Sequence, residues 1–292
     1  MKLLSLSLSH ALALLTTISP TTAYWKGFSV GANNLDGSCK SQADWTRDFQ
    51  TLQSLPGYFS SVRLFASSDC ATLANAIPAA LATNTKLLVG VWTEDSTHFA
   101  AETAALQSAI LQYGSAWIIS VSVGSEDLYR YDTTAAVLAA QINQTRSMLQ
   151  SLGANVPVGH TDTWTAWVNA SNAAVISACD FVGHTGYPYF QDAAIADAAA
   201  VFWDSVQAVQ QVVETVRPGT WVWVMETGWP LSGATLGNAV PSVGNAQTYW
   251  KTVGCDAYSK GHVFMYTLQD ANSSPSFGVV DANFNPIIDV SC

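Results

Sequence analysis

The stretch WVWVMETGWP, from Trp221 to Pro230, reads as a strand that ends at an acidic residue. The five residues from Trp221 to Met225 are aromatic, β-branched or large and apolar, which is typical of a buried strand. Glu226 follows directly, and Gly228 and Pro230 then stop the strand. Because a buried carboxylate is costly without a partner, Glu226 is a candidate catalytic residue. The alternative is a solvated turn glutamate.

Seven further apolar segments resemble this strand and alternate with helical patterns. We expect strands at 27–32, 61–66, 86–92, 117–124, 156–161, 181–187, 221–225 and 263–268, and helices at 44–55, 71–83, 96–112, 133–152, 166–177, 192–216 and 243–258. Strict alternation of this kind indicates a parallel sheet covered by helices. Eight such units in one chain predict a single α/β domain over 24–292, a closed (β/α)8 TIM barrel. A doubly wound open sheet is the alternative, but the segment GANNLDG after the first strand lacks a phosphate-loop spacing.

A second strand-end carboxylate is Glu126, which closes the fourth strand in VGSEDLYR. Strands four and seven of such a barrel face each other across its mouth, so Glu126 and Glu226 are expected in one pocket. Glycoside hydrolysis requires two carboxylates beside the sugar, and aromatic residues commonly line such a site. If the two carboxylates lie about 5–5.5 Å apart, the configuration at the anomeric carbon is retained. The alternative for Glu126 is a salt bridge with Arg130, four residues later. Glu102 and Glu214 fall in helical patterns, and we expect both to be solvated.

The composition limits the partners of the chain. A net charge of −10 argues against nucleic acid or an anionic membrane as the main partner. Eleven Trp and ten Tyr serve either core packing or sugar stacking, and counting does not separate the two. No metal-ligand spacing surrounds His160 or His184, which we expect to be hydrogen-bonded strand histidines. We expect neither a metal nor a cofactor.

The first 23 residues have the pattern of a secretory signal peptide. Lys2 supplies the positive charge, residues 3–15 are largely apolar, and small residues precede Tyr24, the expected first mature residue. The chain carries no C-terminal hydrophobic tail, so we expect a secreted, extracellular protein without a membrane anchor. Sequons at Asn143, Asn169 and Asn272 are candidate glycosylation sites.

Five cysteines in a secreted chain indicate two disulfides and one free thiol. Four of them lie in polar loops, and we expect the pairs Cys39–Cys70 and Cys255–Cys292, although spacing alone leaves other pairings open. Cys179 precedes an apolar strand and is the candidate for a free, buried thiol.

Seven motifs carry a resemblance to a known family: KGFSVGA, SVRLFASSDC, LLVGVW, SVGSEDLYR, VGHTDTWTAW, DFVGHTGYPYF and METGWP. With them the chain resembles glycoside hydrolase family 17, the β-1,3-glucanases, most closely their secreted fungal cell-wall branch. The resemblance implies a (β/α)8 barrel and a retaining mechanism, with Glu126 as acid/base and Glu226 as nucleophile. Departures are Ser125 and Phe65, where relatives carry Asn and a hydroxyl-bearing aromatic, and the additional Cys179.

Further residues are candidates for the substrate site. Tyr187 matches the position expected to contact the nucleophile, and Arg63 either orients a catalytic carboxylate or forms an ion pair across the core. The remaining candidates are expected on the rim of the pocket, as polar contacts or stacking platforms: Trp92, Ser125, Asp162, Trp164 and Trp229.

The leading hypothesis is therefore a monomeric enzyme of the fungal cell wall that hydrolyses β-1,3-glucan or transfers its glycosyl units. One rival is a non-catalytic glucan-binding wall protein. Another is a glucanase that acts on a different β-glucan linkage.

Overall fold

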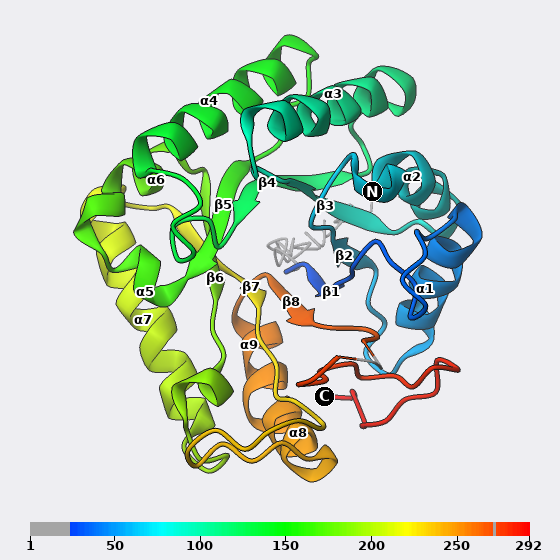
Figure 1. Cartoon of the computed structure of the whole chain (residues 1–292), viewed down its shortest axis with the longest axis vertical. Helices are drawn as coiled ribbons and strands as arrows, with labels where there is room; N and C mark the ends of the chain where they lie inside the picture. Colours follow the sequence, from blue (N-terminus) through cyan, green and yellow to red (C-terminus); the bar gives the residue numbers. More distant parts are fainter. Residues whose placement is uncertain (1–23, 271–272) are drawn as a thin grey trace, which may run out of the picture.

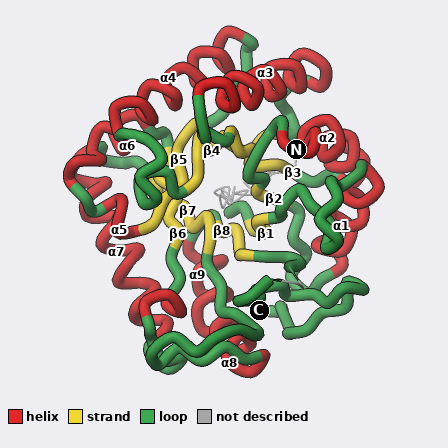
Figure 2. The backbone as a smooth tube through the Cα atoms, in the orientation of Figure 1, coloured by secondary structure: helices red, strands yellow, loops and turns green. Residues whose placement is uncertain are grey.

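Eight parallel strands follow one another around a closed barrel in chain order, and helices cover the outside (Figures 1 and 2). The computed structural model describes residues 24–270 and 273–292, so the expected signal peptide and the Asn272 sequon lie outside the described residues. The strands are β1 Lys26–Ser29, β2 Ser61–Arg63, β3 Lys86–Val91, β4 Ile118–Ser125, β5 Val158–Thr163, β6 Phe181–Thr185, β7 Trp221–Glu226 and β8 Val263–Tyr266. The barrel closes where β8 pairs with β1, which confirms the predicted (β/α)8 fold.

Helices lie between the strands on the outer side of the barrel. They are α1 Gln42–Ser54, α2 Thr72–Thr83, α3 Ser96–Tyr113, α4 Ala135–Ser151, α5 Trp164–Trp167, α6 Ala173–Ala178, α7 Ala198–Val216, α8 Val243–Tyr249 and α9 Cys255–Lys260. The helix expected at 166–177 is divided into α5 and α6, because the side chains of Asn169 and Asn172 bond to nearby backbone groups and break the ladder. The helix expected at 192–216 begins only at Ala198, since Asp192 has a left-handed backbone (φ 56°).

Two apolar layers hold the barrel together. The larger layer lies between the strands and the helices and includes Val222 and Val224 of β7. The smaller cluster consists of Leu88, Ile119, Phe181, Trp223, Met225 and Phe264. Successive residues of β7 thus alternate between the two layers, as residues of a strand buried on both faces do.

An irregularity at the end of β7 changes this alternation. Val224 pairs with His184, but Glu226 pairs with the next residue of β6, Thr185, so Met225 is an extra residue in the ladder. Without this bulge, Glu226 would share the helix-facing side of Val224. The extra residue turns Glu226 toward the mouth of the barrel.

Two disulfides fasten the loops outside the barrel. Cys39 bonds Cys70, and Cys255 bonds Cys292, which confirms both expected pairs. Cys179 is a buried free thiol, as predicted, and burial raises its pKa to about 12. Within the described part of the chain, no helix has the length and apolar character needed to cross a membrane.

Candidate active site

Glu226 lies at the C-terminal end of β7 and is 8% exposed. Arg63 donates from Nη1 to its Oε1 at 2.5 Å, and Tyr187 donates its hydroxyl to Oε2 at 2.8 Å. Each oxygen of the carboxylate therefore accepts a hydrogen bond, which fixes the plane of the group. Next to Glu226, Tyr187 has a pKa well above its usual value, mainly because it is buried and also because of that negative charge, so it remains a donor.

Arg63, at the end of β2, is 1% exposed and does not reach the substrate space. Besides Glu226, its guanidinium donates to the hydroxyls of Ser29 at 3.2 Å and Ser125 at 3.0 Å. The structure therefore places Arg63 as an orienting group beneath a carboxylate. Arg63 was expected either to orient a catalytic carboxylate or to form an ion pair across the core, and its ion pair with Glu226 combines the two roles, while Arg63 itself does not line the cleft.

Glu126 comes directly after β4 and has a left-handed backbone, with φ of 60°. This conformation is uncommon for a non-glycine residue and is held here by a hydrogen bond from Glu126 N–H to the carbonyl of Thr161 at 2.8 Å. Its side chain accepts from the Thr185 hydroxyl at 2.9 Å and lies 3.5 Å from Arg130. The expected alternative contact with Arg130 thus exists together with the placement in the cleft.

The environment of Glu126 favours its protonated form. Burial raises its pKa to about 6, with a further contribution from the negative charge of Glu226, while the hydrogen bond from Thr185 acts in the opposite direction. A carboxyl group with this pKa carries a proton in mildly acidic solution and gives it up readily, as a general acid must.

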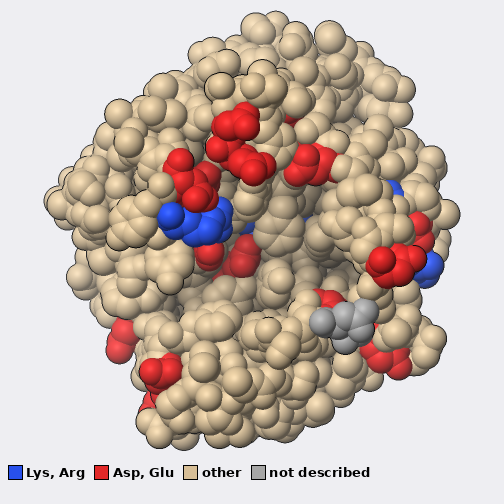
Figure 3. All heavy atoms as spheres, viewed as in Figure 1, with Lys and Arg blue, Asp and Glu red and all other residues tan. Residues whose placement is uncertain are grey.

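A cleft of about 740 Å³ contains both glutamates. Figure 3 looks down on the barrel and shows a central hollow bordered by acidic side chains, with basic atoms beside it. Four of the predicted substrate contacts line this cleft: Trp92, Ser125, Trp164 and Tyr187. Trp92 is also covered by the guanidinium of Arg130, 5.5 Å from its ring centroid.

Several aromatic residues of the cleft were not predicted from the sequence: Phe65 as a lining residue, Tyr129, Phe190, Tyr266 and Phe277. Tyr187 makes edge contacts with three of them, with ring centroids 5.5–6.2 Å apart. Tyr129 follows Glu126 within VGSEDLYR and Phe190 closes the motif DFVGHTGYPYF, so their positions after strands four and six were the available signal. Phe277 lies in the long segment after β8, where no pattern pointed to the cleft.

Asp162 is fully buried and does not line the cleft, which corrects its assignment as a substrate contact. Its carboxylate accepts from the backbone of Leu128 at 2.9 Å and from the ring of His160 at 2.9 Å. The other ring nitrogen of His160 lies 2.6 Å from the carbonyl of Val123, so both ring nitrogens donate. Burial alone lowers the pKa of His160, but the hydrogen bond and charge of Asp162 outweigh it and raise the pKa. Asp162 and His160 therefore brace the Glu126 segment from below.

Trp229 is likewise no stacking platform, because only 3% of its surface is exposed. Its indole N–H donates to the carbonyl of Val240 at 3.1 Å, and its ring packs against Tyr189 and Tyr249. Although Trp229 follows β7, the segment that continues from it folds back over the ring. The residue belongs to the core.

Glu102 is also buried, against the expectation that it is solvated. It accepts from the backbone N–H of Ser67 at 2.6 Å, of Ser68 at 2.7 Å and of Trp92 at 3.0 Å. One helical side chain thereby holds the loops that follow β2 and β3, which carry part of the cleft wall.

One group of side chains in the described residues is close enough to share a metal ion. Asp69, His98 and Glu102 offer ligand atoms within 4.8 Å of one another. His98 Nε2 lies 2.8 Å from Asp69, and Glu102 is occupied by backbone donors, so mutual hydrogen bonds account for this group. None of the three lines the cleft.

The geometry thus has two carboxylates with different surroundings in one aromatic cleft. The family model of the BtgE/BtgC glycoside hydrolase domain matches residues 27–284. The chain belongs to this family. The resemblance to the fungal branch of glycoside hydrolase family 17 is confirmed, and the protein is a glycoside hydrolase.

Two fungal relatives illustrate the family. The chain is 42% identical over 315 residues to a "Probable glucan endo-1,3-beta-glucosidase" of Aspergillus oryzae, which covers 98% of this chain and 67% of the relative. It is 36% identical over 277 residues to a "Glucan 1,3-beta-glucosidase" of Saccharomyces cerevisiae, covering 91% of this chain and 88% of the relative. The chain therefore spans about two thirds of the Aspergillus protein.

Solved structures share the barrel. A glycoside hydrolase family 17 beta-1,3-glucanosyltransferase from Rhizomucor miehei aligns with a TM-score of 0.80 at 26% identity, over 92% of this chain and 98% of that one. An active-site mutant of the Rhizomucor enzyme, in complex with laminaritriose, aligns with a TM-score of 0.79 at 24% identity, over 91% of this chain and 98% of that one. At this identity the second alignment supports the fold.

Proposed function

We propose that this glycoside hydrolase cleaves internal linkages of β-1,3-glucan with retention of configuration, through a covalent glycosyl intermediate on Glu226. The observation that carries the proposal is the contrast between the two carboxylates of the cleft. Glu126 has a pKa raised to about 6 by burial and by Glu226, whereas Glu226 accepts donors on both of its oxygens. One group is thus suited to hold a proton and the other to act as an anion.

The proposed reaction has two steps. Glu226 forms a bond to the anomeric carbon while Glu126 donates its proton to the leaving glycosidic oxygen, so the glucan is cut and a glycosyl ester remains. Glu126, now ionised, then takes a proton from an incoming hydroxyl that attacks the same carbon and releases Glu226. If the hydroxyl belongs to water the result is hydrolysis, and if it belongs to another glucan the result is transfer.

The substrate assignment rests on the relatives and on the cleft wall. The relatives carry the names glucan endo-1,3-beta-glucosidase and beta-1,3-glucanosyltransferase. Trp92 and Trp164 expose ring surface to the cleft, and aromatic faces match the apolar faces of glucose rings. The Ser125 hydroxyl oxygen accepts a hydrogen bond from Arg63, which fixes its position, and its O–H remains able to donate to the sugar 2-hydroxyl.

The cellular setting is part of the proposal. We infer that residues 1–23 are removed and that the mature, monomeric enzyme begins at Tyr24 and acts outside the cell, in the fungal wall. Asn143 and Asn169 are exposed and thus accessible to glycosylation, and Asn272 is a third candidate. N-terminal sequencing of secreted material and its electrophoretic shift after deglycosylation test these points.

Product analysis tests the reaction. Laminarin and laminari-oligosaccharides are incubated with the enzyme, beside cello-oligosaccharides, and the products are resolved by length. Internal cleavage of laminarin, a retained anomer in early NMR spectra and no activity of Glu226→Gln are expected. Products longer than the starting oligosaccharide reveal transfer. Equal activity of wild type and Glu226→Gln would overturn the mechanism, and cleavage of cello-oligosaccharides alone would overturn the substrate.

A further inference from the structure

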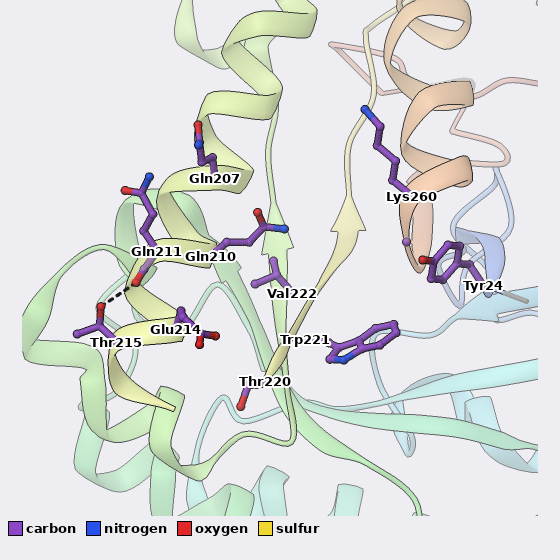
Figure 4. A pocket seen from close by; sticks show the side chains of 11 residues that line it. Tyr24, Gln207, Gln210, Gln211, Glu214, Thr215, Thr220, Trp221, Val222 and Lys260 are labelled. Atoms are coloured by element: carbon purple, nitrogen blue, oxygen red, sulfur yellow. Dashed lines mark hydrogen bonds between the residues drawn. The ribbon is translucent and has the colours of Figure 1, made fainter. Parts of the chain in front are cut away.

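A second hollow, of about 880 Å³, lies at the opposite end of the barrel from the catalytic cleft. It is found between α7 and the end of α9, beside the start of β7 (Figure 4). Trp221 begins β7 and Glu226 ends it, so the two ends are separated by roughly 17 Å of extended chain. The hollow is therefore distinct from the site that contains the glutamates.

Trp221 lines this hollow and is 52% exposed. Its ring contacts His262 with centroids 5.7 Å apart, and His262 in turn lies 4.2 Å from the ring of Trp223. Tyr24 lies beside it at 6.4 Å, and Figure 4 shows both rings at the same end of the hollow. The indole is thus supported from within by tilted contacts with neighbouring rings, while about half of the residue's surface remains in water.

The opposite wall is polar and belongs to one face of α7. Gln207, Gln210, Gln211 and Glu214 follow one another at helical spacing and line the hollow together (Figure 4). Throughout residues 24–270 and 273–292, the side-chain amides of the three glutamines make no hydrogen bond to the protein. Each amide offers both donors and acceptors to a ligand.

The charge in the hollow is small. Lys260 reaches its edge, but its ammonium group is paired with Asp256 at 2.7 Å and lies over the ring of Trp203. Glu214 already accepts from the backbone of Gly219 at 3.2 Å. An anionic ligand would meet Glu214 and a net charge of −10, and an apolar ligand would leave the amides unused.

We propose that this hollow is an auxiliary binding site for a neutral polysaccharide, in which a glucose ring of a β-glucan stacks on Trp221 and its hydroxyls bond to the glutamine amides. A sugar ring combines an apolar face with a rim of donors and acceptors, which is the combination that the hollow presents. The choice of β-glucan rests on the proposed function. A chain held here remains attached to the enzyme between encounters with the catalytic cleft, which raises its effective concentration.

Binding is measured in the Glu226→Gln protein, so that bound glucan is not consumed. The probe is insoluble linear β-1,3-glucan in a depletion assay, with starch granules as a second polysaccharide. Trp221→Ala and Gln210→Ala are compared with Tyr58→Ala, an aromatic residue that is 61% exposed and does not line the hollow. We expect about tenfold weaker binding for Trp221→Ala, a smaller loss for Gln210→Ala and none for Tyr58→Ala.

Turnover separates this site from the catalytic one. With Glu226 intact, Trp221→Ala should hydrolyse short laminari-oligosaccharides at the wild-type rate but lose several-fold activity on the insoluble polymer. Binding unaffected by Trp221→Ala, an equal loss in Tyr58→Ala, or a dimer that Trp221→Ala dissociates would each overturn the auxiliary site. If the wild-type protein is inactive on both the short oligosaccharides and the insoluble polymer, the proposed function is overturned. Glucan binding that depends on Trp221 would establish the auxiliary site even in that case.

Discussion

Arg63 Nη1 lies 2.5 Å from Glu226 Oε1 and joins the end of β2 to the end of β7 inside the mouth of the barrel. The same guanidinium reaches Ser29 of β1 and Ser125 of β4. One buried cation thereby connects four strand ends. It balances the charge of the proposed nucleophile and fixes its direction at the same time.

Replacing this group by Arg63→Lys should damage both stability and activity. Lysine keeps the charge but cannot span three partners from one plane, so we expect the free energy of unfolding to fall by about 3 kcal/mol and kcat to fall about 100-fold. Urea denaturation and steady-state kinetics measure the two effects. Arg47→Lys, at an exposed position, is the control and should change neither. Wild-type kcat in Arg63→Lys would contradict the orienting role.

Tyr187→Phe removes the second donor to Glu226 and leaves the ring. The three edge contacts of Tyr187 with aromatic neighbours are kept, so the fold should hold while kcat falls by about 10- to 100-fold. Tyr189→Phe is the matched control, because it loses a hydroxyl bonded to the carbonyl of Ala234 outside the cleft. Steady-state kinetics and thermal melts of both proteins measure kcat and stability. An equal loss of kcat in the two would argue against a specific role of the Tyr187 hydroxyl at Glu226.

The pH dependence of kcat/KM should report Glu126. Its pKa is raised to about 6, and the general acid must carry its proton, so activity should fall as pH rises above about 6. The hydrogen bond from Thr185 lowers this pKa, and Thr185→Val should therefore move the alkaline limb to higher pH. A pH–rate profile of each protein gives the limb directly. If the alkaline limb of the Thr185→Val profile stays at the same pH or moves to lower pH, the assignment of Glu126 as the general acid is contradicted.

The same group makes stability depend on pH. The pKa of Glu126 in the folded protein lies above its ordinary value of 4.5, so its contribution to stability is fully present below about pH 4.5 and is lost as pH rises through about 6. Glu126→Gln cannot ionise and should show a flatter decline over this range. Denaturation curves at pH 4.5 and pH 7 for the two proteins measure the difference.

Glu102→Gln should destabilise the protein although Glu102 lies outside the cleft. Both carboxylate oxygens of Glu102 accept from backbone N–H groups, and glutamine would replace one of these oxygens by an NH₂ group that cannot accept. A buried backbone N–H left without an acceptor costs about 2 kcal/mol. Since one of these donors is Trp92 N–H, KM should rise as well. Urea denaturation and kinetics test both effects, with the exposed Glu94→Gln as control. Unchanged stability would show that the loops need no such acceptor.

The Cys255–Cys292 bridge encloses a sequence separation of 37 residues. Loop-closure entropy predicts that the double substitution Cys255→Ser with Cys292→Ser lowers the free energy of unfolding by about 4 kcal/mol. Denaturation under non-reducing conditions measures this. Cys179→Ala should lower the free energy of unfolding by less, because it removes only one buried thiol. A larger loss in Cys179→Ala than in the double serine variant would contradict this prediction.

Much of the molecule could be predicted from local patterns. The number and order of the strands and the barrel followed from apolar runs and helical spacing. The position of four cysteines in polar loops indicated two disulfides but left their pairing open, and the structure pairs them as expected. Both cleft glutamates were found because each directly follows the apolar run of a strand. Aromatic residues were harder to assign: Trp164 lines the cleft, whereas Trp229, also beyond a strand end, is buried under its own loop.

The sequence by itself therefore determined which strand carries which carboxylate, because period and composition are local properties of the chain. The direction of each carboxylate was decided by tertiary structure. Simple alternation would place Glu226 on the side of Val224, and only the bulge against β6 turns it toward Arg63 and Tyr187. Glu126 likewise reaches the cleft through a left-handed backbone that Thr161 of β5 holds. Such features depend on pairing between strands far apart in the chain, which a local sequence pattern does not specify.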